Sequence, residues 1–220
     1  MQGHQLIDFF FANTDALGAT LFGFLVLMSL ASWYCIVAKS IVMLRLWQSG
    51  RRFRARFWSA EAPGSVGGQD PFARLAAGSL AVHAGLTQAS GGDPGELLLR
   101  SMQRIVGEEG ARLDSGQTLL ASVAALAPFV GLFGTVWGVH HALIAIGLEG
   151  SASLDRIAGP VGEALVMTAL GLAVAIPALL AYNVFSRSSQ MILAGLDAFA
   201  HELHHYLITG RVLPLVRQGA

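Results

Sequence analysis

Three apolar segments, each long enough to cross a lipid bilayer, alternate with polar segments along the chain. They cover residues 16–38, 119–148 and 157–185. A helix rises about 1.5 Å per residue, so roughly 20 residues cross the hydrocarbon core of a bilayer. The pattern therefore predicts an all-α integral membrane protein with three transmembrane helices.

Four polar segments complete the chain: residues 1–15, 39–118, 149–156 and 186–220. Of the fourteen Lys and Arg residues, ten lie in the second polar segment and three in the last. Because these residues accumulate on the cytoplasmic side of a membrane, we expect those two segments in the cytoplasm. The amino-terminal segment and the short loop are then periplasmic. The amino-terminal segment has no Lys or Arg, which argues against a cleaved signal peptide.

The long polar segment contains two helix start signals. Asp70-Pro71 and Asp93-Pro94 each place an N-cap residue before a proline at the first helical position. After a linker over residues 60–69, we expect one helix to about residue 89. A second helix is expected to run unbroken from Pro94 into the second span, about 50 residues in all. Extensions of the spans would complete a cytoplasmic helical bundle.

Composition narrows the possible functions. The chain is 54% hydrophobic and 13% charged, which is too apolar for an ordinary soluble domain. Its formal net charge of zero gives no general attraction to nucleic acid. Cys35 is the only cysteine, so an internal disulfide and a cysteine metal cluster are excluded. Lys39 is the only lysine, and it lies in no P-loop motif. We expect no enzymatic activity and no cofactor.

The third span contains a single charged side chain, Glu163. A carboxylate in a membrane normally faces a bundle interior, a partner or water, and such residues are candidates for proton transfer. Burial disfavours the charged form of a carboxylate, so a group of this kind can exchange protons near neutral pH. The alternative is a structural glutamate that bonds across an interface and never titrates. We favour the functional interpretation.

Two threonines in the spans are further candidates. Thr135 lies in the second span, and Thr168 lies five residues after Glu163, about 140° around the same helix. Glu163 and Thr168 cannot share a narrow stripe, although both can border a wide pore. The alternative is that each hydroxyl bonds only to a carbonyl of its own helix, as threonines in helices often do.

Small residues predict close helix packing in spans two and three. Gly134 and Gly138 form a GxxxG pattern, and Gly171 is one of many small residues in span three. Pro128 and Pro177 lie inside the two spans and are predicted to kink them.

A basic run, residues 45–56, follows the first span, and the aromatic residues Phe53, Phe57 and Trp58 lie within it or directly after it. It is consistent with binding to anionic lipids. It is also consistent with the solvated face of a helix that continues below the membrane, which is the interpretation we favour.

The sequence His201-Glu202-Leu203-His204-His205 fits the zinc-peptidase pattern H-E-x-x-H. A catalytic zinc needs a third protein ligand, and no Asp, Glu, His or Cys follows His205. We therefore expect no metal site and interpret the segment as an amphipathic helix.

Two blocks of the sequence closely resemble the MotA/TolQ/ExbB proton channel family. GLFGTVWGVHHALIAIG, residues 131–147, with APFV before it, is similar to the second span of that family. AGPVGEALVMTALGLAVAIPALLAYN, residues 158–183, is similar to its third span. The blocks have the order and spacing of the family, and the three-span layout agrees with them.

The resemblance implies a role for each of the three polar residues in the spans. Glu163 takes the place of the third-span glutamate of the family, and Thr135 and Thr168 take the places of its two pore threonines. In the family these residues line the pore of a homopentamer in the bacterial inner membrane. The pore holds transmembrane helices of a single-span partner, ExbD or TolR, whose aspartate is thought to carry the proton.

Within the family, residues 196–204 and 182–185 resemble short ExbB proteins, which energise TonB. His141-Ala142 and the short amino-terminal arm are also found in TolQ proteins of the Tol-Pal system. We favour the ExbB type, with a TonB-like protein as a further partner. A flagellar MotA stator is expected to have four spans, whereas this sequence shows three, so we do not favour the MotA type. A scaffold that only assembles partners, with a structural Glu163, remains the alternative from another class.

Overall fold

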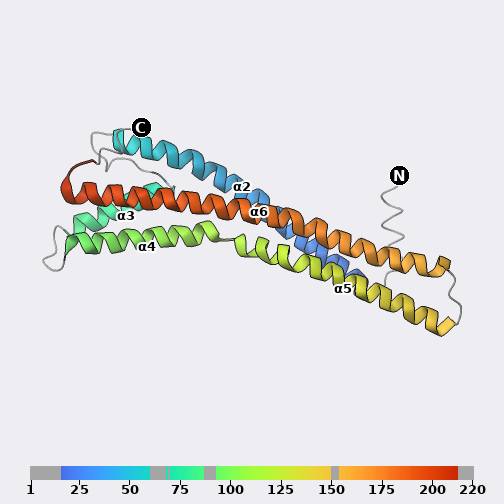
Figure 1. Ribbon diagram of the computed structural model, residues 1–220. Coiled ribbons are helices and arrows are strands. Elements are labelled where there is room, and N and C mark those ends of the chain that lie inside the picture. The colour runs from blue at the N-terminus through green and yellow to red at the C-terminus, as the bar shows by residue number, and fades with distance from the viewer. Residues whose placement is uncertain (1–15, 60–67, 69, 87–92, 150–153, 213–220) are drawn as a thin grey trace. The chain divides into compact units, whose positions relative to one another are not determined.

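The computed structural model describes residues 16–59, 68, 70–86, 93–149 and 154–212, and all its regular secondary structure in these ranges is helical (Figure 1). Within these ranges the chain forms five helices: α2 (Ala16–Ser59), α3 (Pro71–Leu86), α4 (Pro94–Asp114), α5 (Gln117–Glu149) and α6 (Leu154–Thr209). The amino-terminal arm and most of the predicted linker lie outside the described residues.

Three helical stretches are long and apolar enough to cross a membrane. They lie within Ala16–Trp58, Pro94–Ile144 and Gly159–Thr209, and the second stretch includes both α4 and α5. The first stretch contains the predicted span 16–38, and the other two cover the predicted spans 119–148 and 157–185 except for residues 145–148 and 157–158. The prediction of an all-helical protein with three membrane-spanning helices is therefore confirmed by the length and composition of the described helices.

The chain divides into two compact units, each built from separate parts of the sequence. The first unit comprises residues 1–38 and 116–183, and the second comprises residues 39–115 and 184–220. The apolar helix α5 and the first half of α6 belong to the first unit, which contains the candidate site residues.

The second unit packs around a core of aromatic and aliphatic side chains. Its four helical segments all contribute buried residues: Phe53 and Phe57 from α2, Phe72 and Leu75 from α3, Leu98 and Met102 from α4, and Leu196, Phe199 and Leu203 from α6. Phe199 makes edge-to-face contacts with Phe57 and Phe72. The aromatic residues interleaved with the basic run are thus core residues of this unit.

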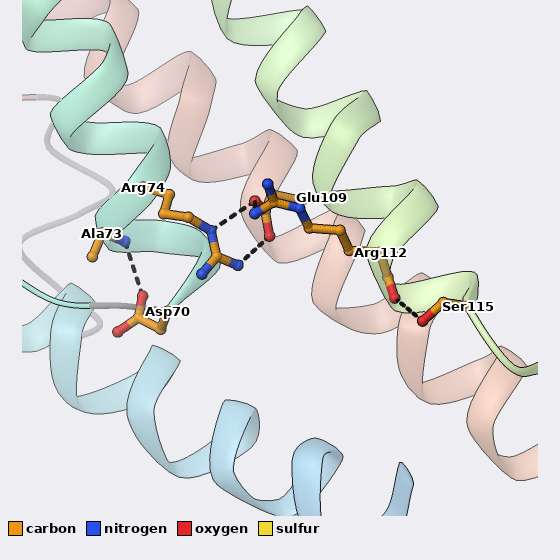
Figure 2. Close-up of polar contacts among 6 residues, drawn as sticks. All are labelled: Asp70, Ala73, Arg74, Glu109, Arg112 and Ser115. Atoms are coloured by element: carbon orange, nitrogen blue, oxygen red, sulfur yellow. Dashed lines mark hydrogen bonds and ion pairs between the residues drawn. The ribbon is translucent and has the colours of Figure 1, made fainter. Parts of the chain in front are cut away.

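Both predicted start signals operate as helix caps. The Asp70 carboxylate accepts a hydrogen bond from the Ala73 N–H group at 2.9 Å, and α3 begins at Pro71 (Figure 2). The Asp93 carboxylate accepts one from the Gly95 N–H group at 3.0 Å, and α4 begins at Pro94. Each carboxylate thereby satisfies an N–H group that has no partner inside its helix.

A buried ion pair joins α3 to α4 inside the second unit. The side chain of Glu109 is only 4% exposed, and both of its oxygens accept hydrogen bonds from the Arg74 guanidinium (Figure 2). Arg112, one turn further along α4, donates a third bond to the same carboxylate at 3.0 Å. The hydrogen bond to Glu109 raises the pKa of Arg74 above its ordinary value. The buried carboxylate is therefore fully paired, as burial of a charge requires.

The prediction of one unbroken helix from Pro94 into the second span is wrong. Helix α4 ends at Asp114 and α5 begins at Gln117. Between them Gly116 adopts a φ of +79°, a left-handed conformation that ends helices and that residues with a Cβ rarely adopt. The Ser115 hydroxyl and N–H groups both donate to the Arg112 carbonyl.

Lys39 stabilises this break from a distant part of the chain. Its ammonium group donates hydrogen bonds to the carbonyls of Leu113 and Ser115, and the Ser189 hydroxyl also donates to the Leu113 carbonyl. These carbonyls belong to the end of α4, where no intrahelical donor is available. A cation at a helix carboxyl end is also favoured by the helix dipole.

Candidate functional site

Glu163 lies on α6 in the first unit and has a carboxylate oxygen without a partner. Its side chain is partly buried, and Oε1 is buried with no hydrogen-bond partner among the described residues. A buried oxygen of this kind costs free energy unless it receives a proton, water or a donor from another chain. The isolated chain therefore leaves this carboxylate incompletely satisfied at the position that sequence chemistry singled out.

Thr135 on α5 and Thr168 on α6 lie directly against each other. Their hydroxyl oxygens are within hydrogen-bond distance, and either can be the donor. The Thr135 hydroxyl is also within bonding distance of the carbonyls of Gly131, at 3.0 Å, and Ala164, at 3.3 Å. The Thr168 hydroxyl reaches the Gly131 carbonyl at 3.3 Å. The two threonines thus form a polar bridge between α5 and α6. Thr135 also bonds to a carbonyl of its own helix, but that bond is not its only contact.

This bridge requires the two helix backbones to approach closely. A Cβ atom added at Gly131 would lie 2.7 Å from the Met167 carbonyl oxygen and 3.1 Å from the Thr168 Cα atom. A Cβ atom at Gly171 would lie 2.6 Å from the Ala127 carbonyl oxygen. Backbone atoms cannot move aside as a flexible side chain can, so both positions require glycine. The approach places each threonine hydroxyl beside carbonyls of the other helix or of its own.

The GxxxG pair packs along the same contact. A Cβ atom at Gly138 would lie 2.9 Å from Ala164 Cβ, and one at Gly134 would lie 3.1 Å from two carbon atoms of Met167. Ala164 and Met167 are 2% and 4% exposed. Small residues on α5 therefore face a buried stripe of α6 that begins at the residue after Glu163.

Sequence reasoning missed two members of this contact. A Cβ atom at Gly131 would lie closest to the Met167 carbonyl oxygen and 3.2 Å from the Gly171 Cα atom, and the atoms nearest to a Cβ atom at Gly134 all belong to the Met167 side chain. A signal for Gly131 was present, because Ala127, Gly131 and Thr135 recur every four residues and so share one face of a helix. Nothing in the sequence distinguishes Met167 from the other large apolar residues of the span.

The two prolines of the spans and the histidine pair at positions 140 and 141 lie outside the contact between the threonines. The helices run through Pro128 in α5 and through Pro177 in α6. The rings of His140 and His141 lie beside Trp137, at centroid distances of 5.9 and 5.8 Å.

The H-E-x-x-H segment has its contacts in the second unit. His201 is exposed and its Nδ1 atom lies 2.9 Å from the Asp197 carbonyl, while His204 contacts the Gly95 carbonyl at 3.0 Å. Glu202 lies 3.7 Å from Arg54. Within the described ranges, no group of three His, Cys, Asp or Glu side chains is arranged to hold a metal ion.

Comparison with known proteins places these residues in a family context. Residues 74–198 match the MotA/TolQ/ExbB proton channel family. The biopolymer transport protein ExbB of Xanthomonas campestris pv. campestris is 45% identical over 205 residues, covering 84% of this chain and 79% of the relative. The ExbB protein of Neisseria meningitidis is 37% identical, covering 90% of this chain and 95% of the relative. The Tol-Pal system protein TolQ of Pseudomonas aeruginosa is 31% identical, covering 83% and 84%. The chain belongs to the MotA/TolQ/ExbB proton channel family.

Proposed function

We propose that this chain is the ExbB-type subunit of an inner-membrane proton channel that energises TonB-dependent transport across the outer membrane. Its relatives named ExbB are 45% and 37% identical over most of the chain, against 31% for the relative named TolQ. The excess of Lys and Arg in residues 39–118 and 186–220 supports a periplasmic amino end and a cytoplasmic carboxyl end. The proposed role is coupling rather than enzymatic catalysis.

The observation that carries the proposal is the buried oxygen of Glu163, which has no hydrogen-bond partner among the described residues and lies in a helix able to span a membrane. An acid in this setting is expensive to maintain without a function. The Thr135–Thr168 bridge provides hydroxyl groups in the same helix pair. In the proposed mechanism, Glu163 and the two threonines form the wall of a proton path, and a carboxylate of an ExbD-like partner moves the proton along it.

The apolar surfaces of the first unit support an assembly of several chains. Large side chains on both α5 and α6 are exposed in the single chain, including Phe129 at 68%, Val136 at 60% and Leu165 at 62%. Such surfaces face lipid or other transmembrane helices. We propose a homopentamer with the partner helices in its centre. One proton crossing 100 mV supplies about 2.3 kcal/mol, so work on the outer membrane needs several protons.

A TolQ-type subunit of the Tol-Pal system is the second candidate, because TolQ relatives are also above 30% identity over most of the chain. The two candidates share the proton path and differ in the partner. Expression in cells that lack either ExbB or TolQ separates them, since the proposal expects rescue of TonB-dependent uptake and not of envelope constriction.

The proposed function is tested by the substitution Glu163→Gln. Glutamine keeps the size and hydrogen-bonding ability of the side chain but cannot release a proton. We expect uptake of an iron complex through TonB to fall at least about tenfold, because one essential acid–base group is commonly worth 10²–10⁴ in rate. Uptake is measured with a radiolabelled complex in cells that lack their own ExbB.

The control is Glu108→Gln, which removes an exposed carboxylate on α4 that pairs with Arg104. This variant is expected to support normal uptake. Assembly of each variant is checked by co-purification with the partner. Normal uptake by an assembled Glu163→Gln variant would contradict the proposal and leave the chain as a non-conducting scaffold.

A further inference from the structure

The exposed face of α2 changes from apolar to basic within the second unit. Ile41 and Leu44 are 46% and 65% exposed, and the exposed arginines Arg45, Arg51 and Arg52 follow. A helix turns 100° per residue, so Arg45 and Arg52 lie within about 20° of each other and about 10.5 Å apart along the axis. This boundary has the chemistry of a helix that leaves a membrane.

The aromatic side chains of this region divide between the two sides of α2. Phe53 and Phe57 are 5% and 0% exposed, because they pack into the core of the second unit. Trp47 is 46% exposed and lies between the apolar residues and the last arginines. Tryptophan is enriched at the level of lipid headgroups, where its ring is apolar and its N–H group is polar. Among residues 39–58, Trp47 is the one exposed aromatic residue, and it lies where a membrane interface would require it.

Among the described residues, Arg45, Arg51 and Arg52 have no acidic partner. Residues 39–59 contain one lysine, five arginines and no Asp or Glu. Lys39 bonds to carbonyls at the end of α4, and Arg54 lies 3.7 Å from Glu202. No described residue forms an ion pair with Arg45, Arg51 or Arg52, whose positive charges remain uncompensated within the part of the chain that the structure describes.

The exposed face of α4 in the same unit provides a direct contrast. Its arginines each have a glutamate within one turn of the helix: Arg100 with Glu96, Arg104 with Glu108, and Arg112 with Glu109. Such i,i+3 and i,i+4 pairs are typical of a helix face in water. The exposed face of α2 differs from that of α4, because all its charges are positive and lie next to exposed apolar side chains.

The sequence alone favoured a solvated helix face for this basic run, but exposed arginines without described acidic partners beside exposed apolar side chains favour the other interpretation. We propose that Arg45, Arg51 and Arg52 bind the headgroups of anionic phospholipids in the leaflet beside α2. Guanidinium groups bind phosphate oxygens with two parallel hydrogen bonds, and their long apolar stems let them reach back toward the headgroups. The attraction extends over about one Debye length, roughly 8–10 Å, which matches the axial spread of these residues. This binding is independent of the proton path and goes beyond the proposed function.

The test measures the lipid preference of the purified full-length chain. The protein in mild detergent is mixed with equal amounts of phosphatidylglycerol and phosphatidylcholine of identical acyl chains, and bound lipid is counted by native mass spectrometry. We expect the native chain to prefer phosphatidylglycerol. The double variant Arg45→Gln/Arg52→Gln should lose more than about tenfold of that preference, since each basic residue near an anionic surface contributes about fivefold.

Two control variants make the result specific. Arg100→Gln/Arg104→Gln removes the same charge from α4 and should leave the preference unchanged. Arg45→Lys/Arg52→Lys keeps the charge and should retain most of the preference for phosphatidylglycerol. Equal lipid preference in the α2 and α4 glutamine variants would overturn the proposal, as would loss of the preference in the lysine variant.

A competition experiment distinguishes a lipid surface from a site for free phosphate. Inorganic phosphate, added at constant ionic strength, should leave the preference for phosphatidylglycerol intact. Displacement of the lipid by millimolar phosphate would overturn the proposal in favour of a soluble anion as the ligand.

Discussion

At the scale of single residues, the space around Gly131 is too small for any side chain larger than that of glycine. A methyl group would meet the Met167 carbonyl oxygen at 2.7 Å and the Thr168 Cα atom at 3.1 Å. We expect Gly131→Ala to force the helices apart and to destabilise the protein by about 1–3 kcal/mol, the usual cost of overpacking a tight contact. The melting temperature of the purified protein in detergent measures this loss.

The matched control for Gly131→Ala is Gly107→Ala on α4. No atom lies within 4 Å of a Cβ atom at that position, and the residue is exposed. Alanine is the better helix former by about 0.5–1 kcal/mol, so this variant should be slightly more stable than the native chain. A Gly131→Ala protein that melts no lower than the control variant would show that the helices separate without cost.

Residue chemistry alone identified Glu163, because a charge in a long apolar segment is visible without any structure. It also named Thr135 and Thr168, and the structure shows that their hydroxyls meet. Their role in lining a pore stays a prediction. Gly131 could not be ranked above the other glycines of the two spans, because its importance depends on which backbone atoms of α6 it faces.

At the scale of helices, the end of α4 depends on one lysine. Lys39 donates to the carbonyls of Leu113 and Ser115, and hydrogen bonds from charged groups contribute about 1.5–3 kcal/mol each. We expect Lys39→Met to loosen the last turn of α4, because these carbonyls lose their donor. Hydrogen–deuterium exchange over residues 110–120 should then become at least about tenfold faster.

Lys39→Arg is the control for this helix end, since arginine keeps the charge and the donors. Its exchange should stay close to that of the native chain. Unchanged exchange in the Lys39→Met variant would mean that Ser115 and Gly116 end the helix without help from α2.

The two kinds of helix end differ in how well sequence can predict them. Asp70 and Asp93 cap N–H groups two or three residues away, so their signal is local and both starts were predicted correctly. The break after Asp114 was missed, although Ser115-Gly116 is a local signal for a helix end. The sequence prediction joined the two helices because an apolar pattern resumes at residue 119. The stabilising contact comes from Lys39, 76 residues before Ser115.

At the scale of the whole molecule, the proposed assembly predicts a defined stoichiometry. Co-purification with an ExbD-like single-span partner, followed by native mass spectrometry, should show five copies of this chain and two of the partner. The exposed apolar side chains of α5 and α6 give the physical reason, because helices of other chains can cover them. A stable monomer or dimer without a partner would contradict the pentamer and leave Glu163 without a pore.

Hydropathy predicted the three membrane-spanning helices, because bilayer thickness sets a length that few other structures need. It could not predict the core of the second unit. That core joins residues from 53 to 203 in the sequence, and no local pattern specifies which aromatic side chains meet. Phe53 and Phe57 illustrate this limit, since they lie among arginines and are nevertheless buried.

The glycine contact between α5 and α6 has a consequence for how the helix pair bears load. Sliding one helix along the other by one turn, about 5.4 Å, would bring the side chain of Ala127 or Thr135 against the backbone that now faces Gly131, because residues four apart share one face of a helix. The pair is therefore stiff against shear, and a push along α5 is transmitted directly to α6. If the proposed coupling moves this protein against a partner, we expect the movement to occur between chains, with α5 and α6 moving together.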